Sequence, residues 1–133
     1  MNIGTAAEMS GVSAKTIRYY EDIGLVPQAL RRDNGYRHYE QTDIETLRFI
    51  QHARRLGFSV GDVAKLLSLW RDKHRASAEV KSLALRHVAE IEGRIAELQS
   101  MRRTLVHLSD RCHGDDRPDC PILNDLAGLG KKD

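Results

Sequence analysis

Two cysteines near the end of the chain are the residues best suited to chemistry. Cys112 and Cys120 are the only cysteines among the 133 residues, and the segment between them, His-Gly-Asp-Asp-Arg-Pro-Asp, is rich in turn formers. This spacing can bring two sulfur atoms to opposite sides of one ion, and no further thiol lies nearby. A pair of thiolates suits an ion that accepts two-coordination. The segment from Cys112 to Cys120 is called the cysteine loop below.

The chemistry of sulfur narrows the choice of ion. Thiolates favour soft ions such as Cu(I), Ag(I), Au(I), Hg(II) and Zn(II). Zinc is almost always four-coordinate in structural sites, whereas Cu(I) held by two thiolates in a line needs nothing more. His113 could add a nitrogen only by folding back beside Cys112. The other polar residues of the loop are hard oxygen donors and are interpreted as turn formers: Asp115, Asp116 and Asp119.

Composition and compartment leave alternatives open for these thiols. No apolar run is long enough to span a membrane and the first residues do not form a signal peptide, so we expect a cytosolic protein. In that compartment a cysteine pair is more often metal-binding or redox-active than a structural disulfide. From the residues alone, a disulfide or two unrelated thiols stay possible. The net charge of +2 does not by itself argue for nucleic acid, although residues 1–75 carry 12 basic and 9 acidic side chains.

The first 40 residues predict a DNA-binding arrangement. Residues 3–9 and 14–22 are two short helices joined by a glycine-containing turn, with Ser13 as the cap of the second, which is the outline of a helix-turn-helix. Asn34-Gly35 is a strong signal for a β-hairpin over residues 29–39. A helix-turn-helix followed by a basic hairpin is typical of a winged helix.

Further helices follow, and the last is long. Thr42 with Glu45 is interpreted as a capping box that opens one helix, and Ser59 with Asp62 caps the next, from residue 60 to about residue 71. Residues 77–108 contain no proline and one glycine. Apolar residues recur there at heptad spacing at Ala84, Val88, Ile91, Ile95, Leu98 and Leu105, with Arg102 interrupting the run. A helix of about 30 residues spans about 45 Å, so we expect a second copy of the chain to cover it.

Basic and aromatic side chains gather on the predicted winged helix. Lys15, Arg18, Tyr19 and Tyr20 fall on the second helix, and Tyr36, Arg37, His38 and Tyr39 fall on the hairpin. Cations and tyrosine hydroxyls contact phosphates, and a helix can enter the major groove. Because neighbours on a helix point about 100° apart, one of the two adjacent tyrosines is expected to pack inward. A solvated basic face is the plainer interpretation.

Several of these stretches resemble the start of MerR-family transcriptional regulators. They are Ile3-Gly4-Thr5-Ala6-Ala7, Thr16-Ile17-Arg18-Tyr19-Tyr20-Glu21, Gly24-Leu25 and Gly35-Tyr36-Arg37-His38-Tyr39. The resemblance continues through Leu56-Gly57-Phe58-Ser59 and the long helix, and the cysteine loop followed by Pro-Ile is similar to the copper-efflux-regulator branch. It implies a homodimeric regulator that binds double-stranded promoter DNA and, with metal bound, distorts it for RNA polymerase. Carried over by position, Lys15, Arg18, Tyr20, Tyr36, Arg37 and Tyr39 are expected to contact the duplex.

The resemblance also gives a meaning to Ser77. In the family, divalent-metal sensors place a cysteine at this position and monovalent-metal sensors a serine. Two thiolates with a singly charged ion keep a net charge of −1, which needs nearby positive potential if the site is buried. A helix N-terminus near Ser77, and Lys81 one turn later, could supply it.

Together these features predict an all-α fold with a small β-wing. We expect a winged helix-turn-helix DNA-binding domain over residues 1–72, a long antiparallel coiled-coil dimerisation helix over residues 76–109, and a metal-binding loop with a tail over residues 110–133. The expected function is a Cu(I)-responsive transcriptional activator of copper efflux genes that also binds Ag(I) and Au(I). One alternative is a thiol redox sensor with a Cys112–Cys120 disulfide, and another is a metal-buffering protein. An enzyme is not expected, because the six histidines are scattered and no nucleophile cluster or phosphate loop occurs.

Overall fold

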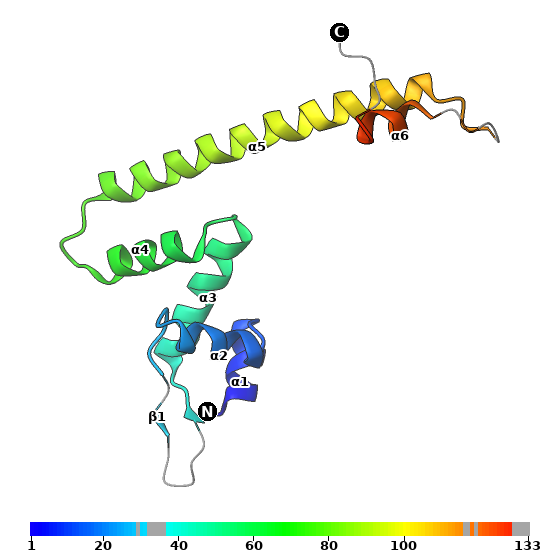
Figure 1. Ribbon diagram of the computed structural model, residues 1–133. Helices are drawn as coiled ribbons and strands as arrows, with labels where there is room; N and C mark the ends of the chain where they lie inside the picture. Colours follow the sequence, from blue (N-terminus) through cyan, green and yellow to red (C-terminus); the bar gives the residue numbers. More distant parts are fainter. Residues whose placement is uncertain (29, 32–36, 116–117, 119, 129–133) are drawn as a thin grey trace. The chain divides into compact units, whose positions relative to one another are not determined.

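The computed structural model describes residues 1–28, 30–31, 37–115, 118 and 120–128. The fold is mostly helical, as expected, with two very short strands among the described residues (Figure 1). The chain divides into two compact units, Met1–Ala84 and Leu85–Asp133, called the N-terminal and C-terminal units below. Within the described residues, no helix is both long enough and apolar enough to cross a membrane.

A helix-turn-helix opens the N-terminal unit. Helix α1 (Ile3–Ser10) begins where the Asn2 side chain accepts a hydrogen bond from the Thr5 backbone at 2.8 Å, and it ends at Gly11, whose φ of 76° is left-handed. Helix α2 (Ala14–Asp22) begins at Ser13, whose hydroxyl accepts from the Thr16 backbone at 3.1 Å. Side-chain caps satisfy backbone groups that a helix end leaves without partners. Both helices are confirmed, α2 at the expected bounds.

The wing is a short antiparallel hairpin. Strand β1 (Leu30–Arg31) pairs with β2 (Arg37–His38), with Leu30 opposite His38 and Arg31 opposite Arg37. The hairpin expected over residues 29–39 is therefore confirmed in its strands. The Asn34-Gly35 turn lies outside the described residues.

Two more helices complete this unit, and one start differs from the prediction. Helix α3 (Gln41–Arg55) begins after Glu40, whose backbone N–H donates to the Asp43 carboxylate at 2.8 Å. The capping box proposed at Thr42 and Glu45 is therefore wrong by two residues, and Thr42 lies inside the first turn. Helix α4 (Val60–Arg71) begins after Ser59, whose hydroxyl accepts from the Asp62 backbone at 3.1 Å, as predicted.

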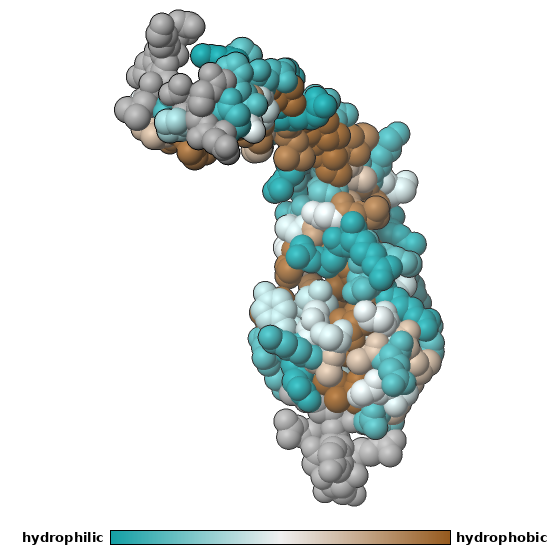
Figure 2. All heavy atoms as spheres, turned by 90° about the vertical axis from the view of Figure 1, so that its right-hand side faces the viewer, coloured by the Kyte–Doolittle hydropathy of each residue, from teal (hydrophilic) through white to brown (hydrophobic). Residues whose placement is uncertain are grey.

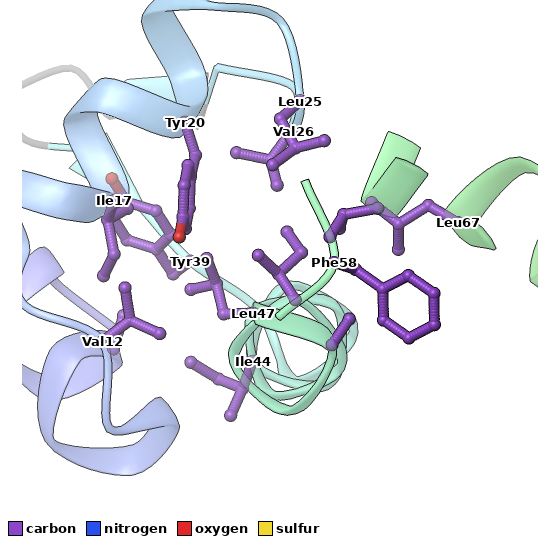
Figure 3. Packing of buried hydrophobic residues seen from close by; sticks show 14 of the residues in the cluster. Val12, Ile17, Tyr20, Leu25, Val26, Tyr39, Ile44, Leu47, Phe58 and Leu67 are labelled. Carbon is purple, nitrogen blue, oxygen red and sulfur yellow. The ribbon is translucent and has the colours of Figure 1, made fainter. Parts of the chain in front are cut away.

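A single apolar cluster holds the N-terminal unit together. Side chains from α2, α3 and α4 meet in it, and the largest fully buried ones are Ile17, Ile44, Leu47, Ile50 and Val63 (Figure 3). Burial of each such side chain is worth about 1.5–3 kcal/mol relative to exposure. Leu83, on helix α5 (Ser77–Arg111), also belongs to this cluster. The first turns of the long helix are thus part of the N-terminal core.

The C-terminal unit contains the rest of α5, the cysteine loop and helix α6 (Pro121–Leu126). The helix expected over residues 77–108 runs three residues further. Its predicted heptad seam is largely exposed in the single chain, and the exposed fraction reaches 49% at Ile95 and 62% at Leu98. Figure 2 shows apolar atoms at the surface of the described residues. Leu108 is one apolar side chain here that is buried.

Candidate functional site

The two cysteines flank the loop between the last two helices. Cys112 follows the final residue of α5, and its backbone N–H donates to the Ser109 carbonyl at 3.1 Å. Cys120 is the N-cap of α6, directly before Pro121. Both are free thiols of intermediate exposure. The elements therefore place a sulfur at each end of the loop, as the spacing predicted.

The surroundings of Cys120 favour the charged form of its thiol. The pKa of its thiol is lowered, first by a hydrogen bond from the Leu123 backbone N–H, and further by the Ile122 backbone N–H and by a hydrogen bond from the Cys112 side chain, against a partial rise from desolvation. Hydrogen bonds to a thiolate favour the charged form. The thiolate is the form that binds soft metals and reacts as a nucleophile. These groups favour a charged sulfur at Cys120, and both cysteines stay free thiols at the two ends of the loop.

The donor set of the loop fits a soft ion of low coordination number. In the part of the chain that the structure describes, no group of three or more His, Cys, Asp and Glu side chains is placed to hold an ion. His113 is exposed, as is Asp115, while Asp116 and Asp119 lie outside the described residues. Among the described side chains, the thiols of Cys112 and Cys120 are the donors that suit Cu(I), Ag(I) or Au(I).

Ser77 and Lys81 lie on the first turns of α5. Both are exposed, and both belong to the N-terminal unit, whereas the cysteines belong to the C-terminal unit. Their predicted contribution to metal selectivity stays a prediction. His87, also on α5, has its Nδ1 3.5 Å from a Glu90 carboxylate oxygen, so it is engaged on its own helix.

One face of α2 presents the features of a nucleic-acid contact. Arg18 and Tyr19 lie three and four residues after Lys15. All three side chains are exposed, and Tyr19 has an exposed fraction of 52%. Residues at this spacing share one side of a helix. Two cations and a phenol hydroxyl on a single helical face can donate to phosphates while the helix enters a groove.

The other tyrosines have different positions. Tyr20 is 7% exposed and Tyr39 is 3% exposed, and both rings belong to the buried cluster of Figure 3. The expectation that one of the adjacent tyrosines packs inward is confirmed by Tyr20. Burial makes both residues part of the core, so a direct contact of either with DNA stays a prediction that the burial does not favour. Tyr36 lies outside the described residues, and of Arg37 only the backbone, in β2, is described.

Polar residues that shape this site escaped the sequence analysis. The Tyr39 hydroxyl donates to Glu21 Oε1 at 2.6 Å, and Glu21 itself is 4% exposed. From α3, Arg48 donates to the Met9 carbonyl through Nε at 3.0 Å and Nη2 at 2.8 Å, and Gln51 donates to the Gly11 carbonyl at 3.1 Å. These side chains satisfy carbonyls at the end of α1 and fix the turn before α2.

Family models and known proteins match nearly the whole chain. The model for MerR HTH family regulatory proteins matches residues 1–70, and the model described as MerR, DNA binding, matches residues 44–108. Heavy metal-dependent transcription regulator 2 of Rhizobium meliloti is 58% identical over 96% of this chain and 86% of its own length. The HTH-type transcriptional regulator CueR of Salmonella typhimurium is 46% identical over 96% of this chain and 93% of its own length.

Solved structures give the same result. The transcription regulator PbrR691 from Ralstonia metallidurans, solved in complex with lead(II), matches with a TM-score of 0.82 and 28% identity, covering 95% of this chain and 98% of that one. HiNmlR, a MerR family regulator bound to promoter DNA, matches with a TM-score of 0.55 and 27% identity over 83% of each chain. With the winged helix-turn-helix and the cysteine loop, these matches show that the chain belongs to the MerR family of DNA-binding transcription regulators, as a metal-responsive member.

Proposed function

We propose that this protein is a Cu(I)-responsive transcriptional activator of genes for copper efflux and detoxification. The observation that carries the proposal is the pair of free thiols Cys112 and Cys120 at the two ends of one loop, with backbone N–H groups of α6 favouring the charged form of Cys120. A pair of sulfurs completes the coordination of a monovalent coinage ion, so Ag(I) and Au(I) are expected to act as surrogates. The 46% identity to CueR supports copper, while relatives of higher identity include one named as a heavy metal-dependent regulator.

The charge of the loaded site supports a monovalent ion. Two thiolates and one Cu(I) leave a net charge of −1, and the backbone N–H groups of Leu123 and Ile122 point partial positive charge at Cys120. We propose that the partner's Ser77, together with the positive end of its α5, adds to this potential. A serine there supplies no third thiolate, which disfavours ions that need one. Lys81, one turn further on, would add a full charge.

The exposed seam on α5 supports a homodimer. Apolar side chains at heptad spacing, among them Val88, Ile95 and Leu105, are about half exposed in the single chain. Water contact on such a stripe is unfavourable, and a second copy of the same helix, lying antiparallel, would remove it. A dimer also presents two DNA-binding faces, as the two half-sites of a palindromic promoter require.

The DNA-binding faces would act on promoter shape. Lys15, Arg18 and Tyr19 of each copy, with Arg37 of each wing, would hold a promoter duplex in the cytoplasm with and without metal. Cys112 and Cys120 would hold the ion, and its capture would shift the dimer between two geometries of different stability. The two faces then bend and untwist the duplex so that RNA polymerase can use it. Deformation of DNA costs several kcal/mol, so the shift needs a large difference in stability between the two geometries.

The test combines an anaerobic titration with transcription. Reduced protein is titrated with Cu(I), Ag(I), Zn(II) and Hg(II), and transcript from a promoter that the protein binds is measured at each step. Cu(I), Ag(I) and Au(I) are expected to activate, and Zn(II) is not. Cys112→Ser and Cys120→Ser are expected to keep promoter binding and lose activation. His113→Ala is the matched control inside the loop, and its activation should persist.

The outcomes separate the parts of the proposal. Full Cu(I) activation in the Cys120→Ser protein would contradict the ligand assignment. Activation by Hg(II) or Zn(II) alone would contradict the choice of ion while leaving the metal-responsive regulator intact. Failure of the reduced protein to bind any duplex would remove the DNA-binding function of this chain.

A thiol redox sensor is the second candidate, because two free thiols at the ends of one short loop also suit a disulfide. The acidic Cys120 would react first with an oxidant, and Cys112 would complete the bond. This candidate predicts that peroxide changes transcription in metal-free protein. It also predicts that the reduced protein is indifferent to Cu(I).

A further inference from the structure

We propose that Tyr39 and Glu21 form a positioning pair that sets the angle of the wing on the DNA-binding unit, and that Tyr39 affects DNA binding through this pair rather than by touching the duplex. The inference rests on DNA binding through α2 and the wing, as proposed above. It assigns a role to the buried carboxylate of Glu21.

The first argument is the position of Glu21. This residue lies in the last turn of α2 and is 4% exposed. A carboxylate at a helix C-terminus faces the negative end of the helix dipole, and burial adds a desolvation cost. An apolar residue here would stabilise the core better. The structure instead satisfies the carboxylate with the Tyr39 hydroxyl at 2.6 Å, a short hydrogen bond of the charge-assisted kind.

The second argument is what Tyr39 connects. It directly follows β2, the returning strand of the wing. Its backbone N–H donates to the Met1 carbonyl at 2.7 Å, and its own carbonyl accepts from the Met1 amino group at 2.9 Å. Its side chain reaches across 18 residues of sequence to α2. Tyr39 is therefore held from its backbone and from its hydroxyl at the base of the wing.

The third argument is the weakness of the wing itself. The described strands β1 and β2 contain two residues each. A two-stranded hairpin is marginally stable by itself, so its direction must be set where it joins the folded unit. Among the described strand residues, Arg31 and Arg37 carry the positive charge that a phosphate attracts, and both belong to the hairpin that joins the unit at Tyr39. A fixed angle between α2 and the wing lets both contact one duplex without reordering.

The experiment measures how DNA binding depends on salt. Full-length protein is bound to a duplex that the wild type itself selects from a random-sequence pool, and affinity is measured from low to moderate salt. Each phosphate contact adds about 0.9 to the slope of log K against log salt. Tyr39→Phe is expected to make this slope less steep by about 1–2. It should also erase ethylation interference at the phosphates that flank the α2 footprint. Glu21→Leu should give the same loss.

Further variants separate positioning from direct contact and from simple destabilisation. Glu21→Gln keeps an acceptor for the Tyr39 hydroxyl and should restore the wild-type slope. The double variant Tyr39→Phe with Glu21→Leu should bind no worse than either single variant. Thr46→Val is the matched control. It removes a buried hydroxyl of α3 that donates to the Thr42 carbonyl at 3.0 Å and accepts from Arg71 Nη2 at 3.3 Å, and it leaves the Tyr39 hydroxyl and the Glu21 carboxylate in place. It should leave the slope unchanged.

The possible results divide clearly. A loss in Tyr39→Phe without a loss in Glu21→Leu would mean that the hydroxyl touches DNA, and it would overturn the inference. A wild-type slope in both variants, or an equal loss in Thr46→Val, would overturn it as well. If the wild-type protein selects no duplex, the DNA-binding proposal fails. If the wild-type protein binds and the variants bind with the same slope, only the inference about Tyr39 and Glu21 fails.

Discussion

The two units of the chain treat their apolar side chains in opposite ways. In the N-terminal unit Ile17, Ile44 and Val63 have an exposed fraction of 0%, while in the C-terminal unit Ile95 and Leu98 remain about half exposed or more. One unit closes its core from its own helices, and the other carries a long apolar stripe on one helix. The N-terminal unit thus buries its apolar side chains through contacts within one chain, whereas the stripe of the C-terminal unit is left for the second copy of the proposed dimer to cover. Four substitutions or conditions separate these two kinds of stability.

The largest effect is expected at the closed core. Ile44→Ala removes a fully buried side chain from α3 and should lower the free energy of unfolding by about 2–5 kcal/mol. Chemical denaturation followed by circular dichroism measures this loss. Glu45→Ala, on the exposed side of the same helix, is the control and should change stability by less than about 0.5 kcal/mol. A small effect of Ile44→Ala would mean that the core of this unit can relax around the cavity.

The next effect tests the open stripe. Ile95→Lys places a charge at the centre of the proposed seam, twice in a two-fold dimer. The dissociation constant of the dimer should rise by about 10–100-fold, which corresponds to a loss of about 1.4–2.7 kcal/mol in the free energy of association. Sedimentation measures the equilibrium, and the melting of the N-terminal unit should not move. Glu92→Lys, also exposed on α5, is the control. Unchanged dimerisation in Ile95→Lys would place the interface elsewhere.

A smaller effect should come from the outer side of the same helix. Gly93 is helical and exposed, and a Cβ built there meets no atom within 4 Å. By heptad counting it lies opposite the seam. Gly93→Ala should therefore stabilise α5 by about 0.5–1 kcal/mol through the greater helix propensity of alanine and leave dimerisation unchanged. Weaker dimerisation would show instead that a partner helix packs against this glycine.

The smallest effect on stability is expected at Cys120. Its thiol pKa is lowered in the folded chain, so the stabilisation that it gives is present above the ordinary thiol pKa and is lost as pH falls through the lowered value. Because the thiol is open to solvent, the change in stability is small, and reactivity is the better measurement. Alkylation by iodoacetamide at neutral pH should be faster at Cys120 than at Cys112, as read by mass spectrometry. Equal rates would contradict the role of the Leu123 and Ile122 backbone groups.

Local signals account for the features that the sequence predicted correctly. Ser13 and Ser59 cap their helices through hydrogen bonds three residues ahead, so α2 and α4 begin where expected. The start of α3 was wrong because Thr42 with Glu45 fits the usual capping-box pattern, whereas Glu40 is not a preferred N-cap. The backbone N–H of Glu40 donates to the Asp43 carboxylate instead, and the helix begins two residues earlier. The local pattern therefore favoured the wrong start.

Long-range pairs were beyond the sequence. The hydrogen bond between Tyr39 and Glu21 spans 18 residues, and the one between Arg48 and the Met9 carbonyl spans 39. Neither a hydrophobic period nor a capping pattern signals such pairs. Tyr39 was therefore predicted to contact DNA from its position in the family motif alone. The cysteine loop was easier to find, because the chain has only two cysteines and they lie close together in the sequence. The acidity of Cys120 arises from backbone groups of α6, which side-chain chemistry does not show.

The short span of the cysteine loop has a consequence for stoichiometry. Both sulfurs belong to residues 112–120 of one chain, so in the proposed site each copy would supply the two thiolates for its own ion, and a dimer would hold up to two ions. A pair of copies then has three states: empty, singly loaded and doubly loaded. If the change of geometry is shared by both copies, the singly loaded pair determines whether the dose–response curve is graded or steep.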